Sequence, residues 1–178
     1  VKAQPKDPEP CLQLAYLYAK YLKKMEPAIR YARQAIALAP AEMDGYQRLC
    51  EVQLSAGDRR AALATLDRAA KVETNDPSFW TQLCKLYLAL IARPDAVPKP
   101  AELEKVNQVF HKALALAPGD ASVLKDAADY FAASQQTKEA IPLYLLSLEL
   151  QSNDSGAREQ LATASRVNNG QTRCLMRV

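Results

Sequence analysis

The sequence has few of the residues on which catalytic or metal sites depend. Its 178 residues include five glycines and a single histidine, His111, and none of the cysteines forms a Cys-x-x-Cys pair. A zinc site needs about four ligands clustered at short spacings, so we expect neither a bound metal nor another cofactor. We expect the cysteines to be small buried apolar residues outside any disulfide framework. They are Cys11, Cys50, Cys84 and Cys174.

Long apolar runs and a one-sided charge are also missing. No run approaches the roughly 20 residues that a membrane span needs, and segment 1–10 is charged and rich in proline, unlike a signal peptide. We expect a soluble protein without membrane insertion; the cytoplasm is slightly favoured, although removal of a leader would leave the compartment unreadable. The 23 basic and 20 acidic residues are spread along the chain, so their net charge of +3 gives no general attraction to nucleic acid.

What the sequence does contain is an internal repeat. The segment Ala35–Pro40 returns almost unchanged as Ala113–Pro118, 78 positions later, and Lys71–Pro77 marks the midpoint of the same cycle. Within each unit of about 35 to 40 residues, apolar residues at spacings of three and four indicate two helices, separated by proline or glycine. Such arrays are solenoids, in which function lies on an extended surface.

The predicted organisation is four repeats followed by a partial one. An extended segment (1–8) precedes repeat 1 (9–40), repeat 2 (41–77), repeat 3 (78–118, with an inserted loop at 93–100), repeat 4 (119–152), a partial repeat or capping helix (153–167) and a tail (168–178). Asp58, Asp76 and Asp120 stand where helix N-caps are needed. A turn is predicted at 168–170. The apolar residues after it favour a longer, truncated array over a capping helix.

Apolar stripes are predicted to face the core of each pair. In the first helix the stripe runs through Cys11, Leu14, Ala15, Tyr18 and Leu22. The third unit gives the clearest pattern, with residues Trp80, Leu83, Cys84, Tyr87, Phe110, Ala113 and Pro118. This pattern resembles the tetratricopeptide repeat (TPR), and the resemblance covers residues 9–167. It implies an all-α, right-handed superhelical solenoid of antiparallel helix pairs.

The resemblance also implies where function would lie. In TPR arrays the first helices line a concave groove, which commonly holds an extended or helical peptide. Carried over unit by unit, the groove positions are Tyr16, Lys20, Gln47, Glu51, Leu54, Thr81, Lys85, Leu88, Lys125 and Asp129. Each of these could equally be an ordinary solvated residue of a helix face. The resemblance therefore implies a non-enzymatic module that binds a peptide or a partner protein.

Three other functions find little support in the residues. Chaperone-binding members of the family use a carboxylate clamp of Lys, Asn, Asn, Lys and Arg, whereas this chain offers Leu12, Tyr16, Arg48, Ser78 and Gln82. Catalysis is not expected, since no serine or cysteine nucleophile accompanies His111. Helical-repeat RNA readers need a basic face in every unit, but segment 119–152 has two basic and five acidic residues.

Two alternatives to the groove-binding module stay open at this point. The chain could be a structural spacer or oligomerisation segment of a larger protein, self-associating through its C-terminal end, or it could be a secretion or assembly chaperone. The loop at 93–100 is also open to more than one interpretation. It could be a simple surface excursion, a lip over the groove or a short docking motif.

Overall fold

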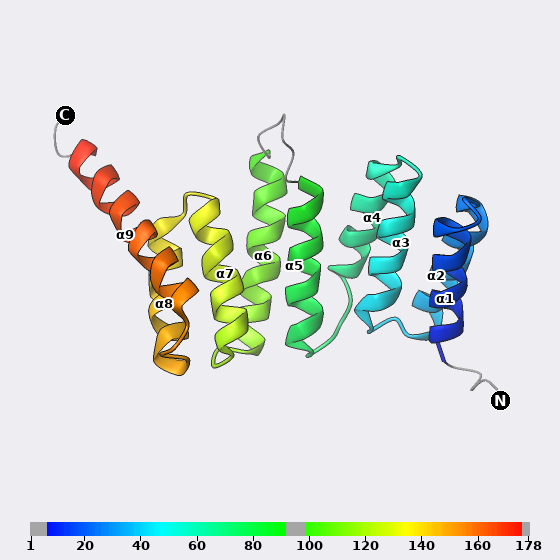
Figure 1. Ribbon diagram of the computed structural model, residues 1–178, viewed down its shortest axis with the longest axis horizontal. Coiled ribbons are helices and arrows are strands. Elements are labelled where there is room, and N and C mark those ends of the chain that lie inside the picture. Colours follow the sequence, from blue (N-terminus) through cyan, green and yellow to red (C-terminus); the bar gives the residue numbers. More distant parts are fainter. Residues whose placement is uncertain (1–6, 92–98, 176–178) are drawn as a thin grey trace. The chain divides into compact units, whose positions relative to one another are not determined.

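Helices are the only regular secondary structure in the described part of the chain. The computed structural model describes residues 7–91 and 99–175, and for Ile91 and residues 169–175 it describes the backbone alone. Within these ranges lie the helices α1 (Glu9–Lys20), α2 (Met25–Leu38), α3 (Met43–Ser55), α4 (Arg59–Ala69), α5 (Pro77–Ile91), α6 (Pro100–Leu116), α7 (Ala121–Ala133), α8 (Thr137–Leu150) and α9 (Ser155–Leu175) (Figure 1). The predicted all-α class is confirmed. Most of the predicted N-terminal segment and of the inserted loop lies outside the described residues.

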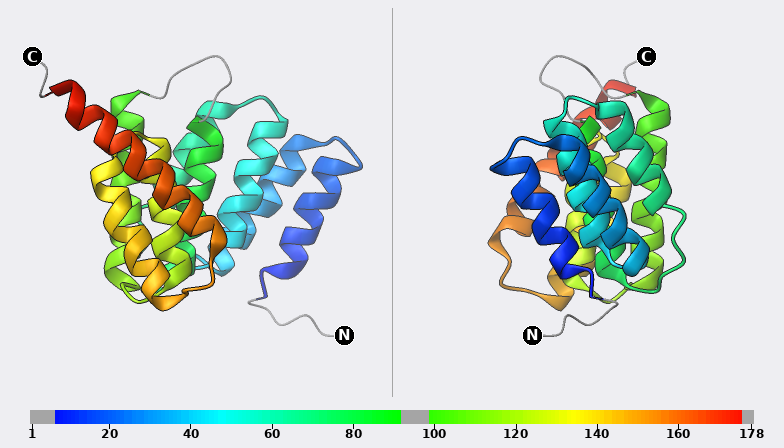
Figure 2. Two further views of the ribbon diagram at one scale, coloured as in Figure 1. Left: turned by 60° about the vertical axis from the view of Figure 1, so that its left-hand side comes forward. Right: turned by 90° about the vertical axis from the view of Figure 1, so that its right-hand side faces the viewer.

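The chain divides into two compact units, residues 1–109 and 110–178, and α6 contributes to both. In the first unit, α1 packs on α2 and α3, and α3 packs on α4 and α5. In the second unit, α7 packs on α8, and α9 contacts both of them (Figure 2). Within each unit, therefore, a first helix contacts its own partner and the next first helix along the chain.

Small residues bring the helices of the first unit close together. Ala15, Ala28 and Ala32 are completely buried. Gly45 on α3 lies so near α2 that an added Cβ would be 2.8 Å from Cγ1 of Ile36 and 3.1 Å from its backbone nitrogen. The contact between α2 and α3 therefore depends on the missing side chain of this glycine.

The cysteines behave as predicted wherever their side chains are described. Cys11, Cys50 and Cys84 are all buried. Burial raises the pKa of the Cys50 thiol to about 11, which keeps it protonated and unreactive near neutral pH. The side chain of Cys174 lies outside the described residues.

Aspartates at the predicted positions begin several helices. Oδ1 of Asp58 accepts a hydrogen bond from the Ala61 amide at 2.9 Å. Oδ1 of Asp76 accepts one from the Ser78 amide at 2.9 Å, with Pro77 as the first residue of α5. Asp120 accepts from the amides of Ser122 and Val123. These carboxylates satisfy amides that have no partner within the helix, so the predicted N-caps are confirmed.

The turn predicted at 168–170 is wrong, because α9 continues through these residues to Leu175. Ala157 and Ala164 are buried on α9, which packs against α8. At the predicted turn, Oδ1 of Asn168 accepts a hydrogen bond from Oγ1 of Thr137, the first residue of α8, at 3.5 Å. Tertiary packing along α9 therefore outweighs the local turn preference of asparagine and glycine.

The stripe predicted for the first helix is also partly wrong. Leu14 is 36% exposed, and Leu22, which follows the end of α1, is 55% exposed. Leu12 is buried instead, together with Cys11 and Ala15. The reason is that α1 has neighbours on one side only, α2 and α3, so a narrower face is covered.

Candidate functional site

The first-helix face of unit 1 carries a group of aromatic and basic side chains that we call the Tyr16 cluster: Tyr16, Lys20, Tyr21 and Arg48. Nζ of Lys20 donates to the Tyr16 hydroxyl and lies 4.9 Å from the centroid of the Tyr16 ring. The guanidinium carbon of Arg48, on α3, is 5.1 Å from the same centroid. The Tyr21 ring packs edge-on against the Tyr16 ring, and the two ring centroids are 6.0 Å apart. Two helices thus place two cations around one ring, an attractive arrangement.

Electrostatics within the Tyr16 cluster follow from these contacts. The hydrogen bond with Lys20 is the main cause of a lowered pKa for the Tyr16 hydroxyl, and the same bond raises the pKa of Lys20. Both groups are at the surface. The bond therefore stabilises the charged ammonium of Lys20 beside the Tyr16 hydroxyl.

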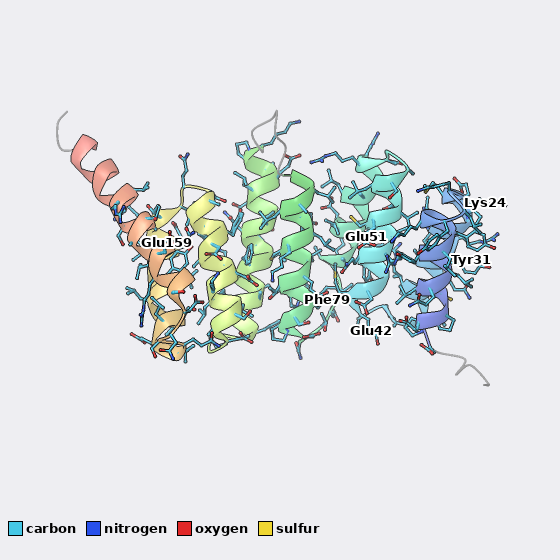
Figure 3. The ribbon with its side chains drawn as sticks, viewed as in Figure 1. Lys24, Tyr31, Glu42, Glu51, Phe79 and Glu159 are labelled. Carbon is cyan, nitrogen blue, oxygen red and sulfur yellow. The ribbon has the colours of Figure 1, made fainter. Side chains whose placement is uncertain are left out.

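Glu51, which Figure 3 labels on α3, holds Arg48 in place from the next turn of the same helix. Nη1 of Arg48 donates to Oε2 of Glu51 at 2.6 Å, and Nε2 of Gln47 donates to Oε1 of the same carboxylate at 3.0 Å. All three side chains are half-buried. Gln47 and Glu51, both predicted as groove residues, therefore act by orienting Arg48 beside Tyr16.

The remaining predicted positions of unit 1 differ in accessibility. Leu54 is 43% exposed near the end of α3. On α5, Lys85 is exposed and Leu88 is half-buried. Thr81 is only 8% exposed, and its hydroxyl donates to the Pro77 carbonyl one turn earlier at 3.0 Å. Thr81 is therefore the least accessible of the predicted positions in unit 1, and its hydroxyl is satisfied by the helix's own backbone.

In unit 2 the first helices line an open groove of about 660 Å³, which we call the α7–α9 groove. Lys125 and Asp129, both predicted, lie along its α7 side, and Nζ of Lys125 donates to Oδ2 of Asp129 at 2.7 Å. The Tyr144 hydroxyl, on α8, donates to Oδ1 of Asp129 at 2.6 Å. Burial, reinforced by this bond, raises the pKa of Tyr144 well above its ordinary range. Asp129 is thus held by two donors.

The walls of the α7–α9 groove combine small and amide-bearing side chains. Ala132, Gly156 and Ala164 leave space, and Gln160 and Thr163 of α9 provide hydrogen-bonding groups. Because small residues line the groove, the backbone of a ligand could approach closely. The amides and hydroxyls of the groove could both donate hydrogen bonds to that backbone and accept them from it.

Comparisons with known proteins agree with this architecture. The solved structure of YrrB, described as a TPR protein with an unusual peptide-binding site, superposes with a TM-score of 0.59 at 13% identity, covering 92% of this chain and 79% of that chain. The MamA protein gives 0.61 at 12% identity, covering 95% and 86%. This chain folds as a TPR protein. A further structural neighbour, in the Cut9–Hcn1 hetero-tetramer of the APC/C, gives 0.53 at 16% identity, covering 95% and 32%.

The relatives found by sequence are larger proteins. Anaphase-promoting complex subunit 7 from Homo sapiens and from Mus musculus are each 28% identical over 160 residues. The match covers 76% of this chain but only 28% of either relative. No family model matches the chain.

Sequence reasoning missed four contributors to the TPR first-helix faces: Tyr21 and Arg48 in unit 1, and Gln160 and Thr163 in unit 2. Arg48 stands at one of the carboxylate-clamp positions, so the alignment to the TPR pattern could have identified it as a groove residue. The two α9 residues were missed because the groove register was not carried into the partial fifth unit. Nothing in the sequence marked Tyr21, which follows the end of α1 and joins the cluster only through the fold.

A polar contact also joins three helices of unit 1 beside a cavity of about 280 Å³. Oδ1 of Asp67 on α4 accepts from the Tyr87 hydroxyl on α5 at 2.8 Å. Nζ of Lys105 on α6 lies 2.8 Å from Oδ2 of the same carboxylate. Since no position here was predicted to bind a ligand, this trio is best understood as a link between successive helix pairs.

Other features of the described TPR chain bear on function. Among residues 7–90 and 99–168, no three histidine, cysteine, aspartate or glutamate side chains lie close enough together to hold a metal ion. His111 is exposed, with its ring 5.6 Å from that of Phe131. In the part of the chain that the structure describes, no helix has both the length and the apolar character to cross a membrane.

Proposed function

We propose that this chain is a non-enzymatic protein-interaction module whose first-helix faces hold segments of a partner protein. The observation that carries the proposal is that accessible polar and aromatic side chains gather on the first-helix face of each unit, as the Tyr16 cluster and the α7–α9 groove. YrrB, which shares the fold, is described as having a peptide-binding site, and the two curated relatives are named as subunits of a complex. Both facts support the proposal.

The two faces favour different chemistry. The Tyr16 cluster offers the Lys20 ammonium beside two rings, whereas the Arg48 guanidinium is already paired with Glu51. An acidic side chain of a peptide would therefore bind at Lys20, next to an apolar one. The α7–α9 groove has little charge beyond the Lys125–Asp129 pair, and its glutamine and threonine would bind peptide amides. The favoured partner segment is thus acidic for the Tyr16 cluster and uncharged for the α7–α9 groove.

Affinity capture from a lysate tests the proposal. The unit 1 variant carries Lys20→Glu and Tyr21→Ala, and the unit 2 variant carries Gln160→Ala and Thr163→Arg. All four side chains are accessible at the surface, so we expect both variants to remain as helical as the parent by circular dichroism.

The matched control for this capture is Arg33→Glu with Gln34→Ala, two exposed positions on the second helix α2. A partner captured by the parent and the control, and reduced at least tenfold with one of the site variants, is the expected result. Equal capture by all four proteins would contradict binding at the first-helix faces and would leave the spacer or oligomerisation role as the better account.

A further inference from the structure

The first helices share one row of residues at positions i, i+4 and i+7. Its register is fixed by the residues at i+1 and i+5, which are buried in every helix pair. On α1, α3 and α7 these are Cys11 and Ala15, Tyr46 and Cys50, and Leu124 and Ala128. The row itself is Gly45, Leu49 and Val52 on α3, and Val123, Ala127 and Tyr130 on α7, and all six residues are buried.

Direct contacts show what this row packs on. A Cβ added to Gly45 would lie 2.8 Å from Cγ1 of Ile36 on α2, the second helix that comes before α3. The Tyr130 ring stacks on that of Phe110 on α6, the second helix that comes before α7, with 4.8 Å between the two centroids. The row is therefore the seam by which a helix pair packs on the pair before it.

On α1 the same row is apolar but uncovered. It consists of Pro10, Leu14 and Leu17, which we call the α1 row. Pro10 is exposed, and Leu14 and Leu17 are 36% and 45% exposed. By contrast, Leu49 and Ala127, the counterparts of Leu14, are 2% and 0% exposed. Repeat arrays need a polar outer face at their ends for solubility, so the α1 row has the composition of an internal seam.

Another uncovered first-helix surface in this chain is not apolar. On α9 the two positions that are buried on the other first helices carry Arg158 and Ala162, and both are exposed. The described residues contain no second helix after α9, and the surface that such a helix would cover is charged or small. The apolar α1 row therefore indicates a surface that another helix covers.

The start of α1 matches that of a first helix that follows a second helix. Asp7-Pro8 repeats Asp76-Pro77, the dipeptide at which the chain passes from α4 to α5. In both cases Oδ1 of the aspartate accepts a hydrogen bond from the amide two residues later, at 2.9 Å. Each aspartate stands three residues before the first residue of its row, so the spacing from junction to seam is the same.

We propose that the α1 row docks the second helix of a further antiparallel pair, located before residue 1 in the same polypeptide. Ridge-into-groove packing of that helix would bury Leu14 and Leu17, as α2 and α6 bury the rows of α3 and α7. The curated relatives have room for such a pair, because the match covers only 28% of either one. This inference is independent of the binding role proposed for the first-helix faces.

A second copy of this chain fits the α1 row less well. The surface of α8 that could receive α1 of another copy is already occupied by α9, through the buried Ala157 and Ala164. Two α1 rows packed on each other would set leucine against leucine. The α2–α3 seam instead sets Ile36 against Gly45, a large residue against a small one, which is how facing helices fill space.

The test extends the whole chain by one helix pair. A duplicate of residues 42–75, which contain α3, α4 and the turn before α5, replaces residues 1–6 and joins directly to Asp7. The duplicate α4 then precedes α1 at the spacing at which α4 precedes α5. The main variant, Leu14→Lys with Leu17→Lys, is made in the parent and in the extended chain. The control, Leu145→Lys with Leu150→Lys, changes two similarly exposed leucines (50% and 49%) on α8.

Circular dichroism and thermal unfolding provide the readouts. We expect the extension to add helix, because the duplicate pair is held by the α1 row. Since Leu14 and Leu17 become buried only in the extended chain, the main variant should lower its melting temperature by at least about 5 °C more than that of the parent. The control should lower both melting temperatures by the same amount.

Equal shifts of the main variant in the parent and in the extended chain, or no gain of helix on extension, would overturn the proposal. Sedimentation velocity of the parent tests the second copy. A monomeric parent is the expected result, whereas self-association that the main variant abolishes would also overturn the proposal, because another copy would then occupy the α1 row.

Discussion

Asp67 illustrates at the residue scale how one carboxylate can join three helices of a repeat array. Burial on its own would raise the Asp67 pKa, but the hydrogen bonds from Lys105 and Tyr87 outweigh it and hold the pKa below its ordinary value. Burial, followed by the same bond, raises the pKa of Tyr87 far above its usual range. The carboxylate is therefore more favourable in the folded chain than in the unfolded one.

Replacing Asp67 with asparagine should lower the free energy of unfolding near neutral pH by about 1 kcal/mol, because charged hydrogen bonds are replaced by weaker ones. A lowered folded-state pKa stabilises the fold above the ordinary aspartate pKa of about 3.9, and this contribution is lost as the pH falls through the lowered value. The difference in free energy of unfolding between parent and variant should therefore become smaller at acidic pH.

Urea unfolding at neutral pH and at about pH 2.5, followed by circular dichroism, measures this difference. If the free energies of unfolding of parent and variant differed by the same amount at both pH values, Asp67 would act through its shape and not through its charge. Tyr87→Phe, which removes one of the two donors, should show a smaller gap with the same dependence on pH.

The α2–α3 contact is the clearest constraint at the scale of elements. Alanine normally stabilises a helix by about 1 kcal/mol relative to glycine. At Gly45, however, the new Cβ would lie 2.8 Å from Ile36 Cγ1 and close to the Ile36 backbone, which cannot move without shifting α2. We therefore expect the steric cost to exceed the gain in helix propensity.

Gly45→Ala should destabilise unit 1 by about 1–3 kcal/mol, the usual range for overpacking. Gly119→Ala is the control, because nothing lies within 4 Å of a Cβ added there. Thermal unfolding of the two variants makes the comparison. If Gly45→Ala were more stable than the parent, α2 and α3 would have to be further apart than described.

An element can be predicted from sequence when the residues that fix its ends are neighbours in the chain, and not when they lie on other helices. The starts of α4, α5 and α7 were predictable because Asp58, Asp76 and Asp120 bond to amides two or three residues ahead. The continuation of α9 past Asn168 was not, because its determinants are α8 and Thr137. The burial of Thr81 could not be predicted for a related reason: the register gives a helix face, but not whether a neighbouring helix covers it.

At the scale of the whole molecule, each of the two compact units of the described chain presents a first-helix face. Register and family resemblance pointed to Tyr16, Lys20, Lys125 and Asp129, which lie on these faces, although their binding role stays a prediction. The same reasoning did not give the chemistry of the faces. That chemistry depends on contacts between helices, such as Arg48 over Tyr16 and Tyr144 bonded to Asp129.

Site-specific photo-crosslinking tests the first-helix account most directly. A photoreactive residue is placed at Tyr21 or Thr163 on the first-helix faces, and at Gln34 on the outward side of α2, and crosslinked peptides are sequenced after exposure to lysate. We predict that Tyr21 and Thr163 link to defined segments of the same partner while Gln34 does not. Crosslinks that arise equally from Gln34, or none from either first-helix face, would contradict the central claim.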